Sequence, residues 1–386
     1  MFNKTEGFAT MIIGEFCDVF PPETDGVGMV VKSYAEELTK MNQHCYYVAP
    51  KAPNCTAVHS FPTFQYLSIG LNGSTYRAGI PQIDISFRKK IKKIDFDILH
   101  AHSPFSAGRE AMRIAKKRNI PLVGTFHTKY YDDFYKATKS KLISNTCIKY
   151  VLEFYNACDE VWAVNHATAD VLREYGFKKE IRVMPNGTNL WHPTEEAIKA
   201  VSEKYNISEE EHLFLFVGQQ NWKKNIRNIL HAVQIYATEN QNFKMIFAGK
   251  GPDEEEIKEL AKELGLRKKV IFTGHITDRN LLMSLYARAD LLVFPSPYDN
   301  APMVVREAAA AGTPSILLKD SCSAEGITHG YNGFLCENTP KSIADCIVDA
   351  LPYAKQVGEK ARETIPLPWN VVVQNALSRY RELVGK

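Results

Sequence analysis

The chain contains 386 residues, 45% of them apolar, which is enough to bury the cores of two domains. A formal net charge of +3 at pH 7 does not indicate a nucleic-acid-binding protein. No apolar run approaches the ~18–20 residues that a membrane-spanning helix needs, so any membrane contact is expected to be peripheral.

The cysteines point to a reducing compartment. The eight Cys residues include no CxxC pair and no His spacing suited to zinc, and no signal peptide is apparent. Reduced thiols and a cytoplasmic location are therefore expected.

Basic residues concentrate between residues 77 and 149, where sixteen Lys and Arg accompany six Asp and Glu. This local excess of ten positive charges predicts a basic face on the first half of the chain. Such a face favours peripheral contact with an anionic membrane, at its inner face for a cytoplasmic protein. A solvated basic surface is the alternative.

The first half alternates strands and helices, which is typical of a nucleotide-binding α/β domain. An opening strand at 11–14 leads through a long loop to Gly26 and Gly28, just before a helix at 29–41. Because glycine lets a ligand approach the backbone, this loop is expected to face a ligand crevice, and a turn packed on the helix start is the alternative. Further strands are expected at 45–49, 96–100, 122–126, 160–164 and 181–184, and further helices at 109–118, 136–159 and 165–175.

Histidines follow two of these strands. His102 comes after the strand at 96–100, and His127 comes directly after the strand at 122–126. The carboxyl ends of parallel strands meet at one edge of a sheet, so both rings are expected at the edge where ligands bind. A purely structural role is the alternative for each.

The second half repeats this plan after a turn cluster at 185–188, the predicted domain boundary. A strand at 213–217 leads into a loop that carries Gly218, Gln219 and Lys224. Further strands are expected at 244–248, 270–273, 291–294 and 315–318, and helices at 194–205, 226–239, 254–264, 278–287, 303–311 and 367–384.

Asp299 and Glu307 frame the loop between the strand at 291–294 and the helix that starts at 303. A loop from the carboxyl end of a strand to a helix N-terminus is where anionic ligands bind in open α/β sheets. Lys224 is suited to a phosphate or diphosphate, and the Glu307 carboxylate to the two vicinal hydroxyls of a ribose. Exposed surface side chains are the alternative for both.

These segments resemble glycosyltransferase family 4 (glycosyl transferases group 1), whose members are retaining, nucleotide-sugar-dependent enzymes of the GT-B fold. Residues 299–307 resemble the Glu-x7-Glu signature of that family. Support comes from the Gly26–Gly28 loop, the TFHT segment at 125–128 and the segment at 217–224. The resemblance implies two Rossmann-like doubly wound domains that face each other across a cleft. It implies that residues 1–188 form the acceptor-side domain and that residues 189–366 form the domain that binds the nucleotide-sugar. Residues 367–386, with Trp369, would form a helix that crosses back to the N-terminal domain.

The resemblance also implies the site residues. Glu307 would bind the donor ribose, Asp299 the transferred sugar and Lys224 the diphosphate, while His127 would lie against the anomeric carbon. Further donor contacts are implied for Gly26, Gly28, Gly218, Gln219, Asn300, Ala301 and Met303. Acceptor-side candidates are Glu15, Asp25, His102, Tyr130 and Tyr131. No Asp-x-Asp motif stands at a strand end, so neither a metal nor another cofactor is expected.

Two positions depart from the family pattern. Asp299 replaces a Glu, which moves the carboxylate by roughly 1.5 Å. Gln219 replaces an Arg, which weakens a diphosphate clamp by about 1–3 kcal/mol unless Lys223 or Arg279 compensates.

The expected function is transfer of a hexose from a UDP-linked donor, such as UDP-glucose, to a lipid or cell-envelope glycan. The alternatives are a sugar-nucleotide-binding subunit with low turnover, a nucleotide-sugar epimerase and a sugar phosphorylase.

Overall fold

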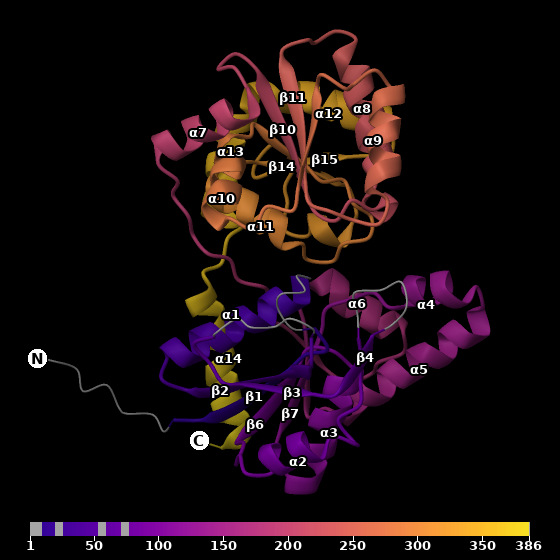
Figure 1. Cartoon of the computed structure of the whole chain (residues 1–386), viewed down its shortest axis with the longest axis vertical. Coiled ribbons are helices and arrows are strands. Elements are labelled where there is room, and N and C mark those ends of the chain that lie inside the picture. Colours follow the sequence, from indigo (N-terminus) through magenta and orange to yellow (C-terminus); the bar gives the residue numbers. More distant parts are fainter. Residues whose placement is uncertain (1–9, 20–25, 53–58, 71–76, 386) are drawn as a thin grey trace, which may run out of the picture. The chain divides into compact units, whose positions relative to one another are not determined.

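The computed structural model describes residues 10–19, 26–52, 59–70 and 77–385 (Figure 1). Contacts divide the chain into two units. Unit 1 comprises Met1–Asn186 together with Trp369–Lys386, and unit 2 comprises Gly187–Pro368. The acceptor and donor roles predicted for these parts of the chain stay predictions.

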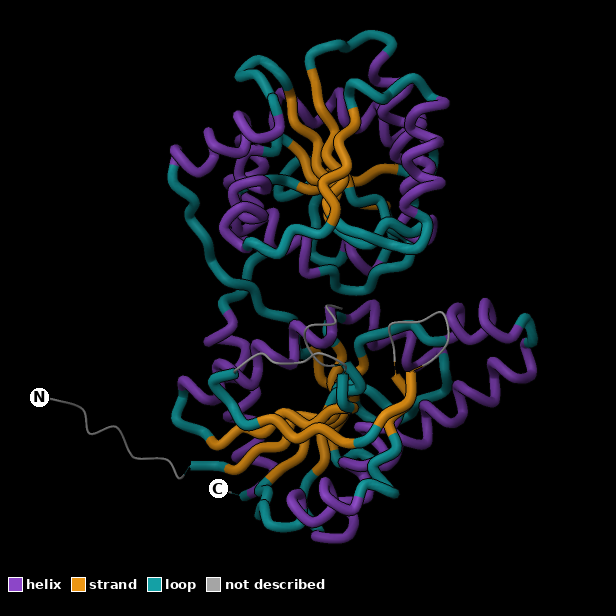
Figure 2. Tube along the Cα trace, in the orientation of Figure 1, coloured by secondary structure: helices purple, strands orange, loops and turns teal. Residues whose placement is uncertain are grey.

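Unit 1 is built on a parallel sheet, whose strands are orange in Figure 2. Its described strands follow the order β3-β2-β1-β6-β7-β8-β9. The order reverses between β1 and β6, and ligands bind at such a switch point in open α/β sheets. Strands β6 and β7 are buried along their whole length, because helices cover both faces of the sheet (Figure 1). The strands are β1 (Ile12–Phe16), β2 (His44–Pro50), β3 (Thr63–Tyr66), β6 (Ile98–Ala101), β7 (Leu122–Phe126), β8 (Glu160–Ala163) and β9 (Ile181–Val183).

Two helical predictions in unit 1 are corrected. Helix α1 (Gly26–Lys40) begins three residues earlier than expected, so Gly26 and Gly28 form its first turn instead of a preceding loop. The single helix expected at 136–159 is two helices, because Lys139 has a left-handed backbone (φ 53°) and ends the first of them. Ser140 then caps the second by accepting a hydrogen bond from the Ile143 amide.

The remaining elements of unit 1 include segments that the sequence did not predict, among them a short antiparallel hairpin. The hairpin strands are β4 (Ser68–Gly70) and β5 (Arg77–Gly79). The helices are α2 (Ile85–Ile91), α3 (Ser106–Arg118), α4 (Tyr131–Thr138), α5 (Lys141–Ala157), α6 (His166–Glu174) and α14 (Trp369–Val384).

Helix α14 is anchored in unit 1 by aromatic rings and an ion pair. The Tyr380 ring stacks on Trp162 of β8 at 5.5 Å, and the Trp369 ring meets Tyr34 of α1 edge-on at 6.0 Å. Arg379 donates to Glu160 at 2.5 and 2.7 Å. The last helix therefore belongs to the core of the first unit, although unit 2 separates the two in sequence.

Unit 2 has a second parallel sheet, in the order β12-β11-β10-β13-β14-β15, with its switch point between β10 and β13. Its strands are β10 (His212–Val217), β11 (Phe243–Ala248), β12 (Val270–Gly274), β13 (Leu291–Val293), β14 (Ser315–Leu318) and β15 (Phe334–Cys336). Its helices are α7 (Glu195–Tyr205), η1 (Trp222–Lys224), α8 (Ile226–Ala237), α9 (Glu254–Glu263), α10 (Arg279–Arg288), α11 (Met303–Ala311), η2 (Cys322–Ala324), α12 (Pro340–Ala350), η3 (Leu351–Tyr353) and α13 (Ala354–Thr364).

Glycines fix two local features of unit 2. A Cβ at Gly249, just after β11, would stand 2.0 Å from the carbonyl oxygen of Gly218, just after β10. Glycine therefore allows the exit loops of these strands to touch. Helix α11 ends at Gly312 (φ 84°), which confirms the predicted end of that helix.

Within the described ranges, no helix is long and apolar enough to cross a membrane.

Candidate active site

The carboxyl ends of β1, β6 and β7 in unit 1 bring together buried polar side chains, which we call the histidine cluster. Glu15 of β1 lies opposite His100 of β6 in the strand register. His102 follows β6, His127 follows β7, and both turn toward the same strand ends. The cluster consists of Glu15, His100, His102, Thr125, His127 and Tyr380.

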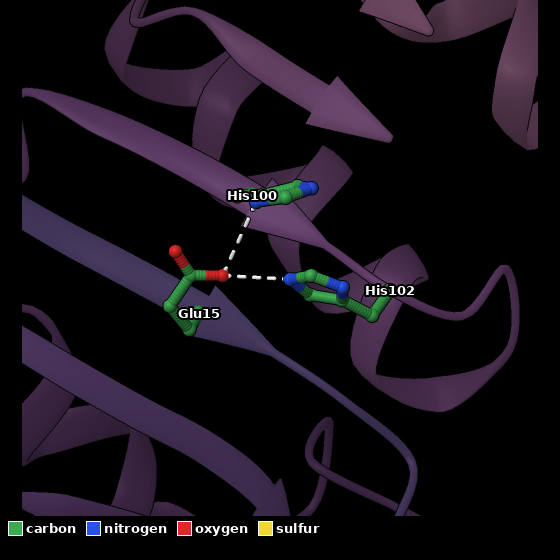
Figure 3. Close-up of side chains that lie close together, drawn as sticks. All are labelled: Glu15, His100 and His102. Carbon is green, nitrogen blue, oxygen red and sulfur yellow. Dashed lines mark hydrogen bonds and ion pairs between the residues drawn. The ribbon is translucent and has the colours of Figure 1, made fainter. Parts of the chain in front are cut away.

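Hydrogen bonds link these side chains in a continuous chain. His102 Nε2 lies 2.8 Å from Glu15 Oε2 (Figure 3), and His102 Nδ1 lies 3.0 Å from His127 Nε2. His100 Nδ1 lies 2.6 Å from the Tyr380 hydroxyl, which also donates to Glu15 Oε1 at 3.2 Å. The other nitrogen of His100 lies 2.6 Å from Thr125 Oγ1.

The cluster is buried, and burial and its own members set the pKa values of its ionisable groups. Glu15 is 0% exposed, His102 1% and His127 8%. Burial raises the pKa of Glu15, but charge and hydrogen bonds from His100 and His102 outweigh it and hold that pKa at about 2. Burial lowers the pKa of His102 to about 4, and burial with the neighbouring rings puts the pKa of His127 well below its usual value. At neutral pH, Glu15 is therefore anionic and both rings are neutral.

Glu15, His100 and His102 also form a group of possible metal ligands, with their ligand atoms all within 4.8 Å of one another. Two ligands bound tetrahedrally to zinc at about 2.1 Å stand about 3.4 Å apart. His102 Nε2 and Glu15 Oε2 are only 2.8 Å apart, which is a hydrogen-bond distance. We interpret the group as a hydrogen-bonded one, and metal-independence stays a prediction.

Three acceptor-side candidates are buried in this structure, and their role toward an acceptor stays a prediction. Glu15 lies within β1 rather than in its exit loop, and neither it nor His102 has surface to offer an acceptor. Tyr130 is 8% exposed, with its ring centroid 5.4–6.1 Å from those of its neighbours Phe105, Phe126 and Phe134. Tyr131, the first residue of α4, is partly exposed and stays a candidate. Asp25 lies outside the described residues.

Unit 2 carries a second polar group beside its switch point, the carboxylate rim, made up of Lys224, Arg279, Tyr286, Ser296, Asp299 and Glu307. Lys224 of η1 donates to Asp299 Oδ1 at 2.5 Å, and Ser296 donates to Asp299 Oδ2 at 2.6 Å. The side chains of Lys224 and Asp299 are 15% and 16% exposed. The structure thus brings together Lys224, which is predicted to bind the diphosphate, and Asp299, which is predicted to bind the transferred sugar. Lys224 follows β10 and Asp299 follows β13.

Glu307 lies in α11 with its carboxylate held by two donors. Arg279 Nη2 donates to Oε1 at 2.8 Å, and the Tyr286 hydroxyl donates to Oε2 at 3.1 Å. The Glu307 side chain is 12% exposed, against 47% for Arg279. A carboxylate has about four acceptor positions, so two remain for ribose hydroxyls. Arg279, one of the two residues expected to compensate for Gln219, is engaged with Glu307.

The residues predicted to contact the nucleotide-sugar through their main chain differ in hydrogen bonding and in burial. The Gly218 amide already donates to the Ala248 carbonyl at 2.9 Å, so it is not available to a ligand in this state. Gln219 is exposed, and Met303 opens α11, where the first amides have no partner within the helix. Asn300 and Ala301 lie in the turn just before them, the former buried and the latter partly so.

Sequence reasoning missed His100, Thr125 and Tyr380. His100 had a usable signal, because alternate residues of a strand share a face and it stands two before His102. Thr125 stands two residues before His127 in the same way. Tyr380 had none, since 280 residues separate it from its partner His100.

Two doubly wound parallel sheets, each with polar residues at its switch point, define a protein of the nucleotide-binding α/β class. The model of Glycosyltransferase Family 4 matches residues 24–192, and the model of Glycosyl transferases group 1 matches residues 197–364. The chain belongs to this glycosyltransferase family and has the GT-B fold.

Relatives and solved structures agree with this assignment. The alpha-monoglucosyldiacylglycerol synthase of Streptococcus pneumoniae is 27% identical over 79% of this chain and 70% of its own. The alpha-monoglucosyldiacylglycerol synthase of Acholeplasma laidlawii is 24% identical over 92% of this chain and 97% of its own. Among solved structures, HepE of Anabaena, in complex with UDP and glucose, has a TM-score of 0.78 at 17% identity over 96% and 99% of the two chains. The sucrose-phosphate synthase of Thermosynechococcus elongatus has a TM-score of 0.81 at 20% identity over 97% and 99%.

Proposed function

We propose that this glycosyltransferase moves a hexose, with retention of anomeric configuration, from a UDP-linked donor such as UDP-glucose to a lipid or cell-envelope glycan. The observation that carries the proposal is the carboxylate rim, in which the Lys224–Asp299 ion pair and the Arg279–Glu307 ion pair lie on segments that follow strands of one sheet. Two relatives named as glycolipid synthases support the lipid acceptor, and the solved complexes with UDP and UDP-glucose support the donor.

In this proposal the rim binds the donor from its nucleotide to its sugar. Glu307 accepts hydrogen bonds from the ribose, Lys224 neutralises the diphosphate and Asp299 contacts the transferred sugar. Asp299 already holds the Lys224 ammonium in place at 2.5 Å, so the cation needs little reorganisation when the donor arrives. The main chain at Ala301 and Met303 adds amides at the start of α11.

Catalysis in this proposal is positioning and leaving-group stabilisation, with no protein general base. The acceptor hydroxyl attacks the face that the diphosphate leaves, which retains the configuration. His127 lies against the anomeric carbon and supports its positive charge. No metal and no other cofactor takes part, and the nucleotide-sugar is a substrate.

A turn in unit 1 has the chemistry of a membrane contact. Leu142 and Ile143, in the first turn of α5, are 78% and 49% exposed. Lys139 and Lys141 precede them in the sequence, at the turn between α4 and α5. Each Lys adds about 1 kcal/mol near an anionic bilayer, and the exposed aliphatic side chains add hydrophobic burial. We propose that this turn lies on the cytoplasmic face of an anionic membrane.

Release of UDP from UDP-glucose by the purified chain tests the reaction. Turnover is expected in the wild type and is expected to be lost in Lys224→Ala and Glu307→Ala. The product's anomeric configuration, read by NMR, tests retention. Binding of UDP-glucose without any turnover would favour the alternative of a sugar-nucleotide-binding subunit with low turnover. Release of a free epimerised sugar nucleotide would favour the alternative of an epimerase. Release of a sugar phosphate would favour the phosphorylase.

Flotation with vesicles tests the membrane contact. Vesicles that contain phosphatidylglycerol should retain the wild type at low salt, and Leu142→Glu with Ile143→Glu should release it. Val348→Glu is the matched control, because Val348 is also an exposed aliphatic residue (47%) but lies on α12 of unit 2. Equal retention of all three proteins, or none of the wild type, would contradict a membrane role for this turn.

A further inference from the structure

We infer that Glu15 and His102 are positioning residues for His127: two successive hydrogen bonds fix the His127 ring in the neutral tautomer with its proton on Nε2. The role of this ring against the transferred sugar rests on the proposed function. The tautomer follows from the histidine cluster alone.

The direction of each hydrogen bond starts from Glu15. An ionised carboxylate only accepts, so His102 Nε2, 2.8 Å away, carries a proton and donates. In a neutral ring the other nitrogen then carries a lone pair. His102 Nδ1 is therefore the acceptor in the 3.0 Å contact with His127 Nε2, and His127 Nε2 must carry the proton.

The rest of the cluster closes without conflict. The Tyr380 hydroxyl donates to Glu15 Oε1, and His100 Nδ1 donates to Tyr380 Oη at 2.6 Å, with Glu15 Oε2 3.3 Å away. His100 Nε2 then accepts from the Thr125 hydroxyl. Each of these contacts then has one donor and one acceptor. The reverse direction at His127 would need a second proton on His102, which its burial opposes.

Exposure decides which member acts on a ligand. It rises along the series from 0% at Glu15 to 1% at His102 and 8% at His127. His127 is the most exposed of these three residues, so Glu15 and His102 act through it. Tyr34 of α1 packs edge-on against the His102 ring at 5.6 Å, which restrains its rotation.

The fixed tautomer has a consequence for the reaction. A neutral His127 with its proton on Nε2 carries a lone pair on Nδ1 and presents no positive charge to the transferred sugar. A cationic His127 would repel the positive charge that develops at the anomeric carbon. The Glu15 anion behind two hydrogen bonds favours that charge instead.

NMR of the full-length chain labelled with ¹⁵N-histidine tests the tautomer without any substrate. The His127 signals are assigned by their loss in His127→Gln. In the wild type at pH 7 we expect a protonated Nε2 and an unprotonated Nδ1. In His102→Leu we expect a mixture of tautomers or the other form. A wild-type ring that is cationic, or protonated on Nδ1, would overturn the inference whether or not the protein transfers a sugar.

Kinetics test the effect on the reaction. His102→Leu removes both bonds and should lower kcat/KM by roughly 10- to 100-fold, mostly through kcat. His102→Gln has an amide that can bond to either partner, so it should recover part of that loss. Tyr380→Phe is the matched control, since it removes a hydroxyl from the same cluster but leaves the bond between His102 and His127. A positioning role would be excluded if kcat/KM fell as far in Tyr380→Phe as in His102→Leu, or if His102→Leu left kcat/KM unchanged.

Discussion

The histidine cluster of unit 1 and the carboxylate rim of unit 2 occupy corresponding places in two similar sheets, beside the switch point. They differ in access to water. The cluster is buried, with His127 its most exposed member at 8%, and its charged and polar atoms hydrogen-bond to one another. The rim is 12–16% exposed at Lys224, Asp299 and Glu307, and its carboxylates are held by ion pairs that a ligand can share.

This difference predicts that substitutions in the two regions affect different properties, the stability of the fold in one and donor binding in the other. A buried group that loses one member leaves the others buried without partners, which costs folding free energy. A partly exposed ion pair contributes little to stability, because water replaces the lost partner. Changes in the cluster should therefore destabilise unit 1, whereas changes in the rim should spare the fold and impair donor use.

The largest expected effect is on stability. Glu15→Leu removes the acceptor of His102 and Tyr380, so we expect the free energy of unfolding to fall by about 3–5 kcal/mol. Urea denaturation followed by tryptophan fluorescence measures it. Asp299→Leu, the matched change in the rim, should cost about 1 kcal/mol or less. Similar losses in both variants would erase the distinction between the two regions.

Next in size is the catalytic effect of the rim. Lys224→Ala should lower kcat by roughly 10²–10³-fold, because the departing diphosphate loses its cation. Steady-state UDP release measures kcat, and a thermal melt should show little change. A melting temperature that falls as far as in Glu15→Leu would contradict a role in catalysis rather than in folding.

Acid should act on the cluster first. The pKa of His102 is about 4 in the folded chain, against 6.5 for an ordinary histidine. Its contribution to stability is thus complete above pH 6.5 and is lost as the pH falls toward 4. Glu15, with a pKa of about 2 instead of 4.5, adds a further loss between pH 4.5 and 2. Urea midpoints between pH 8 and 4 should fall more steeply in the wild type than in His102→Gln, and parallel curves would count against this assignment.

A smaller effect on the free energy of unfolding is expected for a substitution beside the rim. Gln220 is fully buried, and no partner among the described residues pairs with its amide oxygen or nitrogen. Gln220→Leu removes this unsatisfied group, so we expect a gain of about 1–2 kcal/mol in the free energy of unfolding. Urea denaturation checks the sign, and a loss of stability would show that the amide has a partner in solution.

The smallest expected effect is that of a chelator. UDP release should be unchanged in EDTA, because the rim supplies its cation from Lys224. A loss of activity that Mg²⁺ or Mn²⁺ restores would contradict metal-independence.

Much of the fold was predictable, since buried strands such as Leu213–Val217 are apolar runs that end in loops. Failures came where backbone geometry overrode composition, as at Lys139, whose left-handed backbone divides one predicted helix into two. Residues of the rim were predictable because Asp299 and Glu307 lie close in sequence and frame one loop.

The histidine cluster was only half predictable. His102 and His127 stand at strand ends, which gave their position but not their burial. Their linkage to Glu15 depends on the strand register, and that to Tyr380 on a helix from the far end of the chain. Neither relation leaves a local signal in the sequence.

Calorimetric titration of UDP into the wild type, Lys224→Ala and His102→Gln would separate the two regions most directly. UDP should bind the wild type and His102→Gln with similar affinity, because the buried cluster does not touch the nucleotide. Lys224→Ala should bind it roughly tenfold or more weakly, as expected for loss of one charge-assisted contact. Equal affinity for UDP in the wild type and Lys224→Ala would contradict a donor site at the carboxylate rim.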